Sequence, residues 1–381
     1  MRMRRRGKFA GGLAAGILAL TACADGGGND EDKQPPNRPS RPSGSPSPAA
    51  PPPAKPQEVR ADGAELLHRE RGTGSAQNPA FSPDGKSLLF TAFHGGYNEG
   101  AAALRVLPLE GRTGRPRDLL DEDDQAAVNL PGSSWRPSAG VAFASDRAGR
   151  DEIWVLTPGG RPLRVTDHEG DSGYLEPSFS PDGEWIVFQE SVQREDPDAR
   201  AALADRTALG SLWKVRRDGT EQVRLVDGPA GRTDNREPNW SPRGDRLVFQ
   251  RRELGSETWA LYVMNADGSG VRRLTTVEGE HTDASWSPDG RSVVFSSTSG
   301  GLDLPKIFVL PVDGGGAPVR VTRERGTYDG APSWSPDGRW IAFESHPGSA
   351  DRPTALWRVP APGVHAAPTG RPAREQRSSG G

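Results

Sequence analysis

The chain has 381 residues, of which 33% are hydrophobic, 48 are glycine and 36 are proline, and its formal net charge is -3. This composition is typical of a turn-rich chain that is soluble over most of its length. A weakly acidic chain without a basic patch interleaved with aromatic residues argues against a nucleic-acid partner.

Residues 1–23 have the features of an export signal. A basic start is followed by an apolar stretch, Phe9–Ala22, that is too short to span a bilayer as a stable helix. The stretch ends in Leu-Thr-Ala and Cys23, which resembles the bacterial lipobox, whose cysteine is lipidated and becomes the first mature residue. Cys23 is the only cysteine in the chain, so we expect it to be a membrane anchor. An ordinary secretory signal is the alternative, and the export route, Sec or twin-arginine, stays open.

Residues 24–60 are rich in glycine, proline and serine and cannot bury enough apolar surface to fold. We expect them to form a disordered tether between the lipid anchor and a folded domain at 61–363. Residues 364–381 are predicted to be a disordered tail.

A repeated five-residue phrase, Trp-Ser-Pro-Asp-Gly, organises the folded domain. Proline, aspartate and glycine in this order favour a tight turn between two strands. Equivalent prolines are 54, 44, 61, 46 and 48 residues apart, a spacing that suits the blades of a propeller. The copies lie at 81–85, 135–140 (a worn copy), 179–183, 240–244, 286–290 and 334–338.

Each turn is followed by an unbroken apolar run such as Ile341-Ala342-Phe343, which predicts a strand covered on both faces. A third and a shorter fourth strand follow in each unit except the last, which has no fourth strand after Pro360. The segment Glu65–Gly72 resembles Arg320–Gly326 at the end of the fifth unit. We therefore predict an all-β, six-bladed propeller of four-stranded blades whose last blade is closed by the N-terminal strand.

The loops between second and third strands, together with the connections between blades, are predicted to form one varied face, and binding loops are usually of this kind. Its longest member is Ser191–Gly210. It also carries the acidic run Asp121–Asp124, which lacks the spacing of an EF-hand loop. Histidines without a pattern are often plain surface residues. The candidate binding residues on this face are His94, Tyr97, His168, Tyr174, His281, Tyr328 and His346.

The residue four positions before each motif serine is predicted to lie near the central channel. These positions are Asn78, Gly132, Glu176, Glu237, Asp283 and Ala331. We expect Asn78, Glu176, Glu237 and Asp283 to form a candidate ligand or cation site, because carboxylate oxygens suit a hard cation such as Ca²⁺. Hydrogen bonding to neighbouring loops, or to channel water, is the alternative. The motif tryptophans Trp135, Trp240, Trp286 and Trp334 are predicted to be inter-blade core.

No enzyme signature is present: the sequence has no GxSxG elbow, no Walker loop and no GxGxxG after a strand. Since Cys23 is accounted for by the lipobox, it is not a candidate nucleophile. We therefore expect no enzymatic activity and no cofactor beyond the channel cation.

The phrase Pro-x-Trp-Ser-Pro-Asp-Gly, the following Ile/Val-x-Phe, Ser145-Asp146-Arg147 and Ile153-Trp154-Val155 together resemble the WD40-like repeat of the TolB propeller family over residues 61–363. The resemblance implies a six-bladed propeller; TolB itself is periplasmic and docks partners of the Tol and Pal envelope system. We expect a lipid anchor and tether in place of the α/β domain that precedes the TolB propeller, so a Tol-system role is not implied. Similar propellers occur in prolyl oligopeptidases and in oligogalacturonate lyases, whose metal-binding histidines have no matched counterpart here.

Together these features predict a lipid-anchored, monomeric, extracytoplasmic propeller at the cell membrane. It would bind a protein or cell-wall partner through its loop-rich face. The alternative is a metal-assisted carbohydrate-active or lactone-cleaving enzyme that uses the channel carboxylates and nearby histidines.

Overall fold

The computed structural model describes residues 58–110, 114–120, 126–127, 134–169, 172–192, 209–313, 316–348 and 352–363. The chain divides into two compact units, Met1–Pro56 and Gln57–Gly381, and the fold below is that of the second. Several predictions lie outside the described residues: the lipobox with Cys23, the tether up to residue 57, Gly132, the run Asp121–Asp124, the loop 193–208 and the tail 364–381.

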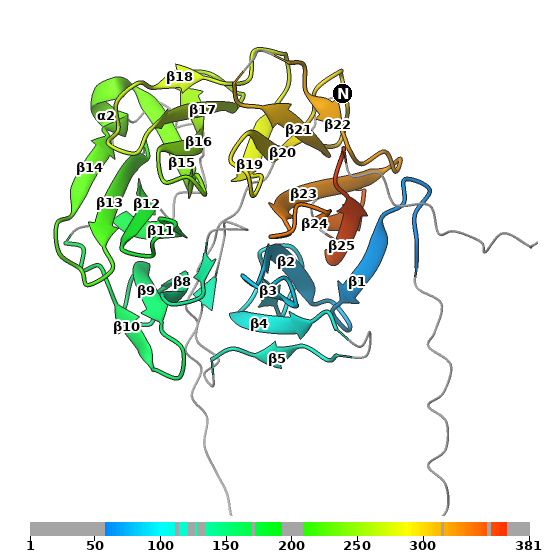
Figure 1. Ribbon diagram of the computed structural model, residues 1–381, viewed down its shortest axis with the longest axis horizontal. Helices are drawn as coiled ribbons and strands as arrows, with labels where there is room; N and C mark the ends of the chain where they lie inside the picture. The colour runs from blue at the N-terminus through cyan, green and yellow to red at the C-terminus, as the bar shows by residue number, and fades with distance from the viewer. Residues whose placement is uncertain are drawn as a thin grey trace, which may run out of the picture. The chain divides into compact units, whose positions relative to one another are not determined.

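Six antiparallel sheets follow one another around a ring (Figure 1). Successive strands of a blade are neighbours, and the first strand of each blade is the innermost. Blade one contains β2 (Ser75–Phe81), β3 (Ser87–Phe93), β4 (Ala102–Pro108) and β5 (Arg117–Asp118). Blade three contains β11 (Ser172–Phe179), β12 (Trp185–Val192), β13 (Ser211–Arg216) and β14 (Val223–Val226). Blade four contains β15 (Thr233–Trp240), β16 (Arg246–Glu253), β17 (Ala260–Asn265) and β18 (Arg272–Arg273), and blade five contains β19 (His281–Trp286), β20 (Ser292–Ser297), β21 (Lys306–Pro311) and β22 (Val319–Arg320).

The last blade combines both ends of the folded unit. It contains β23 (Thr327–Trp334), β24 (Trp340–Pro347), β25 (Ala355–Pro360) and, as its outermost strand, β1 (Glu65–Arg69). Figure 1 shows the blue β1 beside the red β25, and Glu65 is paired with Arg358. The predicted ring closure by the N-terminal strand is confirmed, so β25 is not left as an unpaired outer edge of the last blade.

The ordered chain begins slightly before the predicted boundary at residue 61. Val59 forms a bridge with Glu65. The Arg60 guanidinium lies 3.9 Å from the Trp357 ring centroid and 3.2 Å from the Asp329 carboxylate. These contacts hold the segment before β1 against the last blade.

The strands of blade two are less regular than those of the other blades, as the degenerate copy of the motif at 135–140 suggests. Its inner edge is made by two short strands, β6 (Ala126–Ala127) and β7 (Trp135–Arg136), that both pair with β8 (Gly140–Ser145). Its outer strands are β9 (Glu152–Leu156) and β10 (Pro162–Arg164). A single helical turn, α2 (Gly228–Gly231), precedes blade four. Within the described ranges, no helix has the length and apolar character needed to cross a membrane.

The repeated phrase forms the predicted hairpin turn. In blade one the Gly85 N–H donates to the Ser82 carbonyl at 2.8 Å, and Gly85 has a φ of +72°, which an L side chain rarely adopts. Asp84 Oδ1 accepts hydrogen bonds from the Ser82 hydroxyl (2.6 Å) and the Lys86 N–H (3.0 Å). The side chains therefore satisfy the turn locally, which explains why this phrase recurs.

The hydrophobic core is a ring of six clusters, one at each junction between neighbouring blades. Four junctions contain a motif tryptophan: Trp135 (blades one and two), Trp240 (three and four), Trp286 (four and five) and Trp334 (five and six). Phe179 and Phe81 take this place between blades two and three and between blades six and one. The inter-blade role predicted for the tryptophans is confirmed, because a four-stranded sheet must bury both faces against its neighbours.

Candidate functional site

A backbone irregularity marks the inner strand of five blades at the positions predicted to face the channel. The strand pairing shifts register there, as in a β-bulge, and the residue has a positive φ. A non-glycine residue in this conformation stores about 1–3 kcal/mol of strain and is found preferentially at functional sites. The φ values are +53° at Asn78, +58° at Glu176, +52° at Glu237, +56° at Asp283 and +44° at Ala331.

The bulges are linked from blade to blade by carboxylates. Glu176 Oε2 accepts the backbone N–H of Glu237 at 2.9 Å, and Glu237 Oε2 accepts the N–H of Asp283 at 3.0 Å. The Asp283 carboxylate in turn accepts the N–H of Ala331. Each side chain thus satisfies the backbone donor that the next bulge removes from its strand ladder. We call these residues, with Glu344 below, the axial carboxylate ring.

Glu344 completes this ring at the junction of the last and first blades, and the sequence analysis did not select it. Its Oε2 accepts the N–H of Asn78 at 2.9 Å, and the residue is only 1% exposed. Glu344 directly follows the apolar run of its repeat. A signal was present, because five of the six residues at this position are polar: Thr91, Gln189, Gln250, Ser296 and Glu344, with Ala144 as the exception.

Three of the predicted binding residues meet beside Glu344. The Tyr328 and His346 rings are stacked with centroids 4.8 Å apart and an interplanar angle of 8°. Tyr97, from the loop between β3 and β4, packs edge-on against both rings, at 6.0 and 5.8 Å. The Tyr97 hydroxyl also hydrogen-bonds to Tyr328 and to Glu344. We call Tyr97, Tyr328, His346 and Glu344 the axial aromatic cluster.

His346 is buried in this cluster, with 1% of its surface exposed, and neither ring nitrogen has a hydrogen bond of ordinary geometry within the described residues. Burial lowers the pKa of His346, and the neighbouring Pro347 carbonyl and Asp329 carboxylate oppose this effect.

Burial also favours the protonated form of the carboxylates in the axial carboxylate ring. It raises the pKa of Glu344 to about 8 and, although the nearby Arg236 guanidinium opposes it, that of Glu176 to about 7. The pKa values of Glu237 and Asp283 are raised by burial and, for Glu237, by the other carboxylates. Both side chains keep part of their surface exposed, so we expect a smaller rise in pKa there than burial of the whole side chain would give. At neutral pH the ring can therefore both donate and accept hydrogen bonds.

This geometry neither confirms nor excludes the predicted cation site. In the part of the chain that is described, no three His, Cys, Asp or Glu side chains converge as a metal-ion site. The bonds to backbone N–H groups match the alternative stated for these carboxylates. Ca²⁺ in the channel stays a prediction.

His168 and Tyr174 belong to a separate network between blades two and three. His168 Nδ1 lies 2.9 Å from the Tyr174 hydroxyl, which also accepts from Gln222. The Ser172 hydroxyl lies between the other ring nitrogen of His168 and Glu190. Tyr174 is 3% exposed and packs on Phe188, so its role is mainly structural.

The remaining two histidines differ sharply in exposure. His281 is fully buried; its ring lies 3.1 Å from the Val277 carbonyl and 2.9 Å from the Ser297 hydroxyl. His94 is exposed at the start of the loop that carries Tyr97. Burial prevents His281, His346 and Tyr174 from touching a partner in this conformation, so for them the expected surface position is wrong: their strands run into the inter-blade core.

Comparisons with known proteins agree with the repeat pattern. Residues 215–354 match the family model described as the TolB beta propeller domain. A Protein TolB homolog of Chlorobium luteolum is 33% identical over 129 residues, which is 33% of this chain and 26% of that protein. In two further curated relatives the matches cover 54% and 19% of their length. The chain thus spans about half or less of these relatives.

Solved structures show the same architecture. The structure of putative TolB from Agrobacterium tumefaciens has a TM-score of 0.53 at 22% identity and covers 75% of this chain and 90% of that chain. Oligogalacturonate lyase in complex with manganese has a TM-score of 0.52 at 16% identity, over 81% and 96%. At these identities the likeness concerns the fold alone.

The strand topology and these neighbours define the class: the domain is a closed six-bladed β-propeller. The family match over residues 215–354 and the TolB relatives show that this propeller is similar to that of TolB.

Proposed function

We propose that this protein is a non-enzymatic, lipid-anchored, extracytoplasmic propeller that binds a protein or cell-envelope partner through its loop-rich face. Cys23 would hold it on the outer side of the cell membrane. The TolB resemblance supports an envelope location and a protein partner. We expect the protein to act as a monomer.

The observation that carries this proposal is the axial aromatic cluster. Tyr97 and Tyr328 are partly exposed, and both rings pack against His346. The Tyr97 hydroxyl is also held by its hydrogen bonds to Glu344 and to Tyr328. Rigid tyrosines above a polar floor bind a partner at a low cost in side-chain entropy. Strained bulges and carboxylates with raised pKa values beneath them are also typical of functional sites.

A second aromatic side chain extends this surface. Trp259, in the loop between β16 and β17, is partly exposed, and the guanidinium groups of Arg236 and Arg252 lie 5.2 and 4.7 Å from its ring centroid. Both arginines are paired with the buried Asp234, at 3.0 Å. Tryptophan and arginine dominate the binding energy of protein interfaces, so this group is the second expected contact.

The proposal can be tested by chemical cross-linking and mass spectrometry on intact cells that express the full-length chain. We expect one envelope protein to cross-link to the loops at 94–101 and 254–259. Trp259→Ala should lower its capture about tenfold or more, as for an interface tryptophan. Arg291→Ala, which changes an exposed side chain next to the turn of blade five on the opposite, turn-bearing face, is the control. Equal capture by wild type and Trp259→Ala would contradict the proposal.

Two further variants separate parts of this proposal. Cys23→Ala should release the protein from the membrane fraction; a membrane-bound Cys23→Ala protein would refute the lipid anchor. Replacing residues 193–208 by a short glycine-serine turn leaves β12 and β13 in place, since these end at Val192 and begin at Ser211. Unchanged partner capture by this variant would exclude the blade-three loop from the binding surface.

The enzymatic alternative has one observation in its favour. Glu176 and Glu344 have pKa values near 7 and 8, in the range that suits acid-base catalysis at neutral pH. A metal-assisted carbohydrate-active or lactone-cleaving enzyme would contain metal in proportion to protein. Metal analysis of the purified protein before and after EDTA distinguishes the two functions, because the binding function requires no metal.

A further inference from the structure

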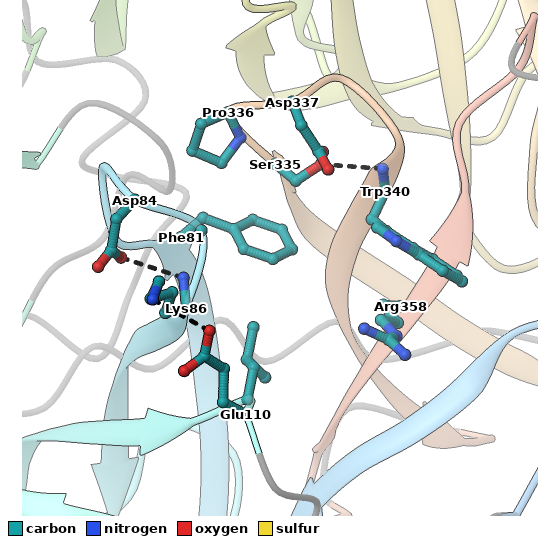
Figure 2. A pocket seen from close by; sticks show the side chains of 11 residues that line it. Phe81, Asp84, Lys86, Glu110, Ser335, Pro336, Asp337, Trp340 and Arg358 are labelled. Atoms are coloured by element: carbon teal, nitrogen blue, oxygen red, sulfur yellow. Dashed lines mark hydrogen bonds and ion pairs between the residues drawn. The ribbon is translucent and has the colours of Figure 1, made fainter.

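A pocket of about 570 Å³ lies on the turn-bearing face, between blades six and one (Figure 2). Figure 2 shows Phe81 between the two motif turns, with Trp340 opposite and Asp84 and Asp337 on the turns themselves. Its volume is within the range of ligand-binding pockets. The loop-rich face, where the proposed partner binds, is at the other end of the blades, so this pocket is independent of that function.

The pocket arises where a motif tryptophan is missing. Four junctions contain tryptophan as the first motif residue, whereas the junctions before blades one and three contain the smaller Phe81 and Phe179. The two phenylalanine junctions can therefore be compared directly, because the repeat makes their backbones equivalent.

At the junction of blades two and three, an arginine of the protein itself occupies this place. Arg136 Nη2 donates to the Phe179 carbonyl and Nε donates to the Ser180 carbonyl, each at 3.3 Å. The Asp182 carboxylate is the nearby negative charge that favours its ionised form. This junction shows which group the space beside a motif phenylalanine accepts: a guanidinium held by two carbonyl oxygens, with a carboxylate nearby.

At the junction of blades six and one the same acceptors are present, but the arginine is not. Ser335 stands where blade two has Arg136, and Phe81, Ser82 and Asp84 correspond to Phe179, Ser180 and Asp182. We propose that this pocket binds the guanidinium of an arginine side chain carried by an extended segment of a partner protein. Phe81 and Asp84 line the pocket, and the Phe81 carbonyl oxygen and the Asp84 carboxylate are the acceptors in this proposal.

The charges around the pocket favour such a ligand. The basic side chains that line it are already paired, Lys86 with Glu110 at 3.2 Å and Arg358 with Glu65 at 2.7 Å. Asp84 and Asp337 each use Oδ1 for the turn, which lowers their pKa values and keeps both ionised. Arg339 also lies 4.0 Å from Asp337 Oδ2, but this pair is exposed to solvent. The Asp84 and Asp337 carboxylates beside Phe81 and Trp340 suit a flat cation with an apolar stem.

The pocket also has room for more than the guanidinium. Leu109, Pro336 and Trp340 supply apolar surface around the acceptors. Arg358 covers one side of the Trp340 ring at 4.1 Å, so the indole is held in place before any ligand binds. The residues that flank the arginine in a bound segment would pack on this surface, which favours a peptide over a free guanidinium compound.

Isothermal titration calorimetry on the full-length chain tests the proposal with acetyl-Gly-Arg-Gly-amide. We expect saturable binding that is at least tenfold tighter than that of the peptide with citrulline in place of arginine, because citrulline keeps the shape and removes the charge. Agmatine is the small guanidinium control. Agmatine that binds as tightly as the peptide would overturn the assignment to a protein segment.

Two variants fill the pocket with groups that the other repeats already use. Phe81→Trp introduces the residue of four other junctions, whose indole N–H donates to the glycine carbonyl of its own turn in Trp240 and Trp334. Ser335→Arg copies Arg136. Both are expected to abolish peptide binding. Binding that persists in both variants, or the absence of saturable binding to wild type, would overturn the proposal.

If Phe81→Trp and Ser335→Arg do not fold, a matched pair of charge variants tests the proposed peptide binding. Asp84→Asn should weaken peptide binding about tenfold, whereas Asp289→Asn, which alters the equivalent turn of blade five with the same hydrogen bonds, should leave it unchanged. Equal effects of the two variants on binding would show that the pocket carboxylate does not contact the peptide, and would refute the proposal.

Discussion

Glu344 gives the protein a stability that falls as the pH rises. Its pKa is raised from 4.5 to about 8 because the carboxyl is buried and lies near Asp283. A group with a raised pKa in the folded state binds its proton more tightly there than in the unfolded chain. Its contribution is therefore complete below about pH 4.5 and is lost as the pH rises through 8.

The magnitude follows from the pKa difference. Each pH unit between the two pKa values corresponds to about 1.4 kcal/mol, so ionisation of Glu344 costs the folded state on the order of 5 kcal/mol by pH 9. Glu344→Gln keeps an oxygen acceptor for the Asn78 N–H and cannot ionise. We expect this variant to be close to wild type, or slightly less stable, at pH 5 and several kcal/mol more stable at pH 9.

Urea unfolding followed by tryptophan fluorescence at pH 5, 7 and 9 measures this difference. Glu278→Gln, which alters an exposed carboxylate, is the control and should change stability by less than about 0.5 kcal/mol at every pH. A stability difference between wild type and Glu344→Gln that does not change with pH would refute the reasoning. Glu176, Glu237 and Asp283 also have raised pKa values. Both wild type and Glu278→Gln should therefore lose stability as the pH rises.

Three further variants test the fold. Ala331 has a φ of +44°, so Ala331→Gly should raise the unfolding free energy by about 0.5–1 kcal/mol; a loss of stability in calorimetry would argue against strain at the bulge. Arg60→Ala leaves the buried Asp329 with Lys306 as its remaining ion-pair partner, at 3.5 Å, and should lower the unfolding free energy measured in urea by about 3 kcal/mol. An unchanged unfolding free energy would mean that the segment before β1 is not part of the folded unit. Trp286→Ala should cost about 3–5 kcal/mol, because this side chain fills the junction of blades four and five; a stable variant would mean that the tryptophan is not core.

The blade architecture could be predicted because its signals are local. The turn at Ser82–Gly85 is built from hydrogen bonds between residues at most five positions apart, and the apolar run after it needs only to be buried on both faces. A third strand follows the apolar run in every blade, as predicted. Ring closure was predictable for the same reason, since β1 keeps the pattern of a fourth strand although it comes first in the chain.

The candidate site was only partly predictable. Counting back from the motif serine selects Glu176 and Glu237, but it says nothing of the backbone N–H that each carboxylate accepts. Glu344 was missed because its partner Asn78 is 266 residues away in the sequence. His281 and His346 lie in loop-like sequence and were expected on a surface, yet both are buried, His281 on the innermost strand of blade five and His346 on the second strand of the last blade.

The sequence by itself determined the turns and the number of blades, because these depend on interactions within one repeat. It also determined the strand that closes the ring, because β1 keeps the residue pattern of a fourth strand although it pairs with β25 from the other end of the folded unit. Only the tertiary structure decided the pKa values of the axial carboxylates, the contacts of Tyr97 with Tyr328 and His346, and the pocket between Phe81 and Ser335. These properties depend on burial and on pairs of residues from different blades, and the distance between blades is set by the closed ring and not by any single repeat.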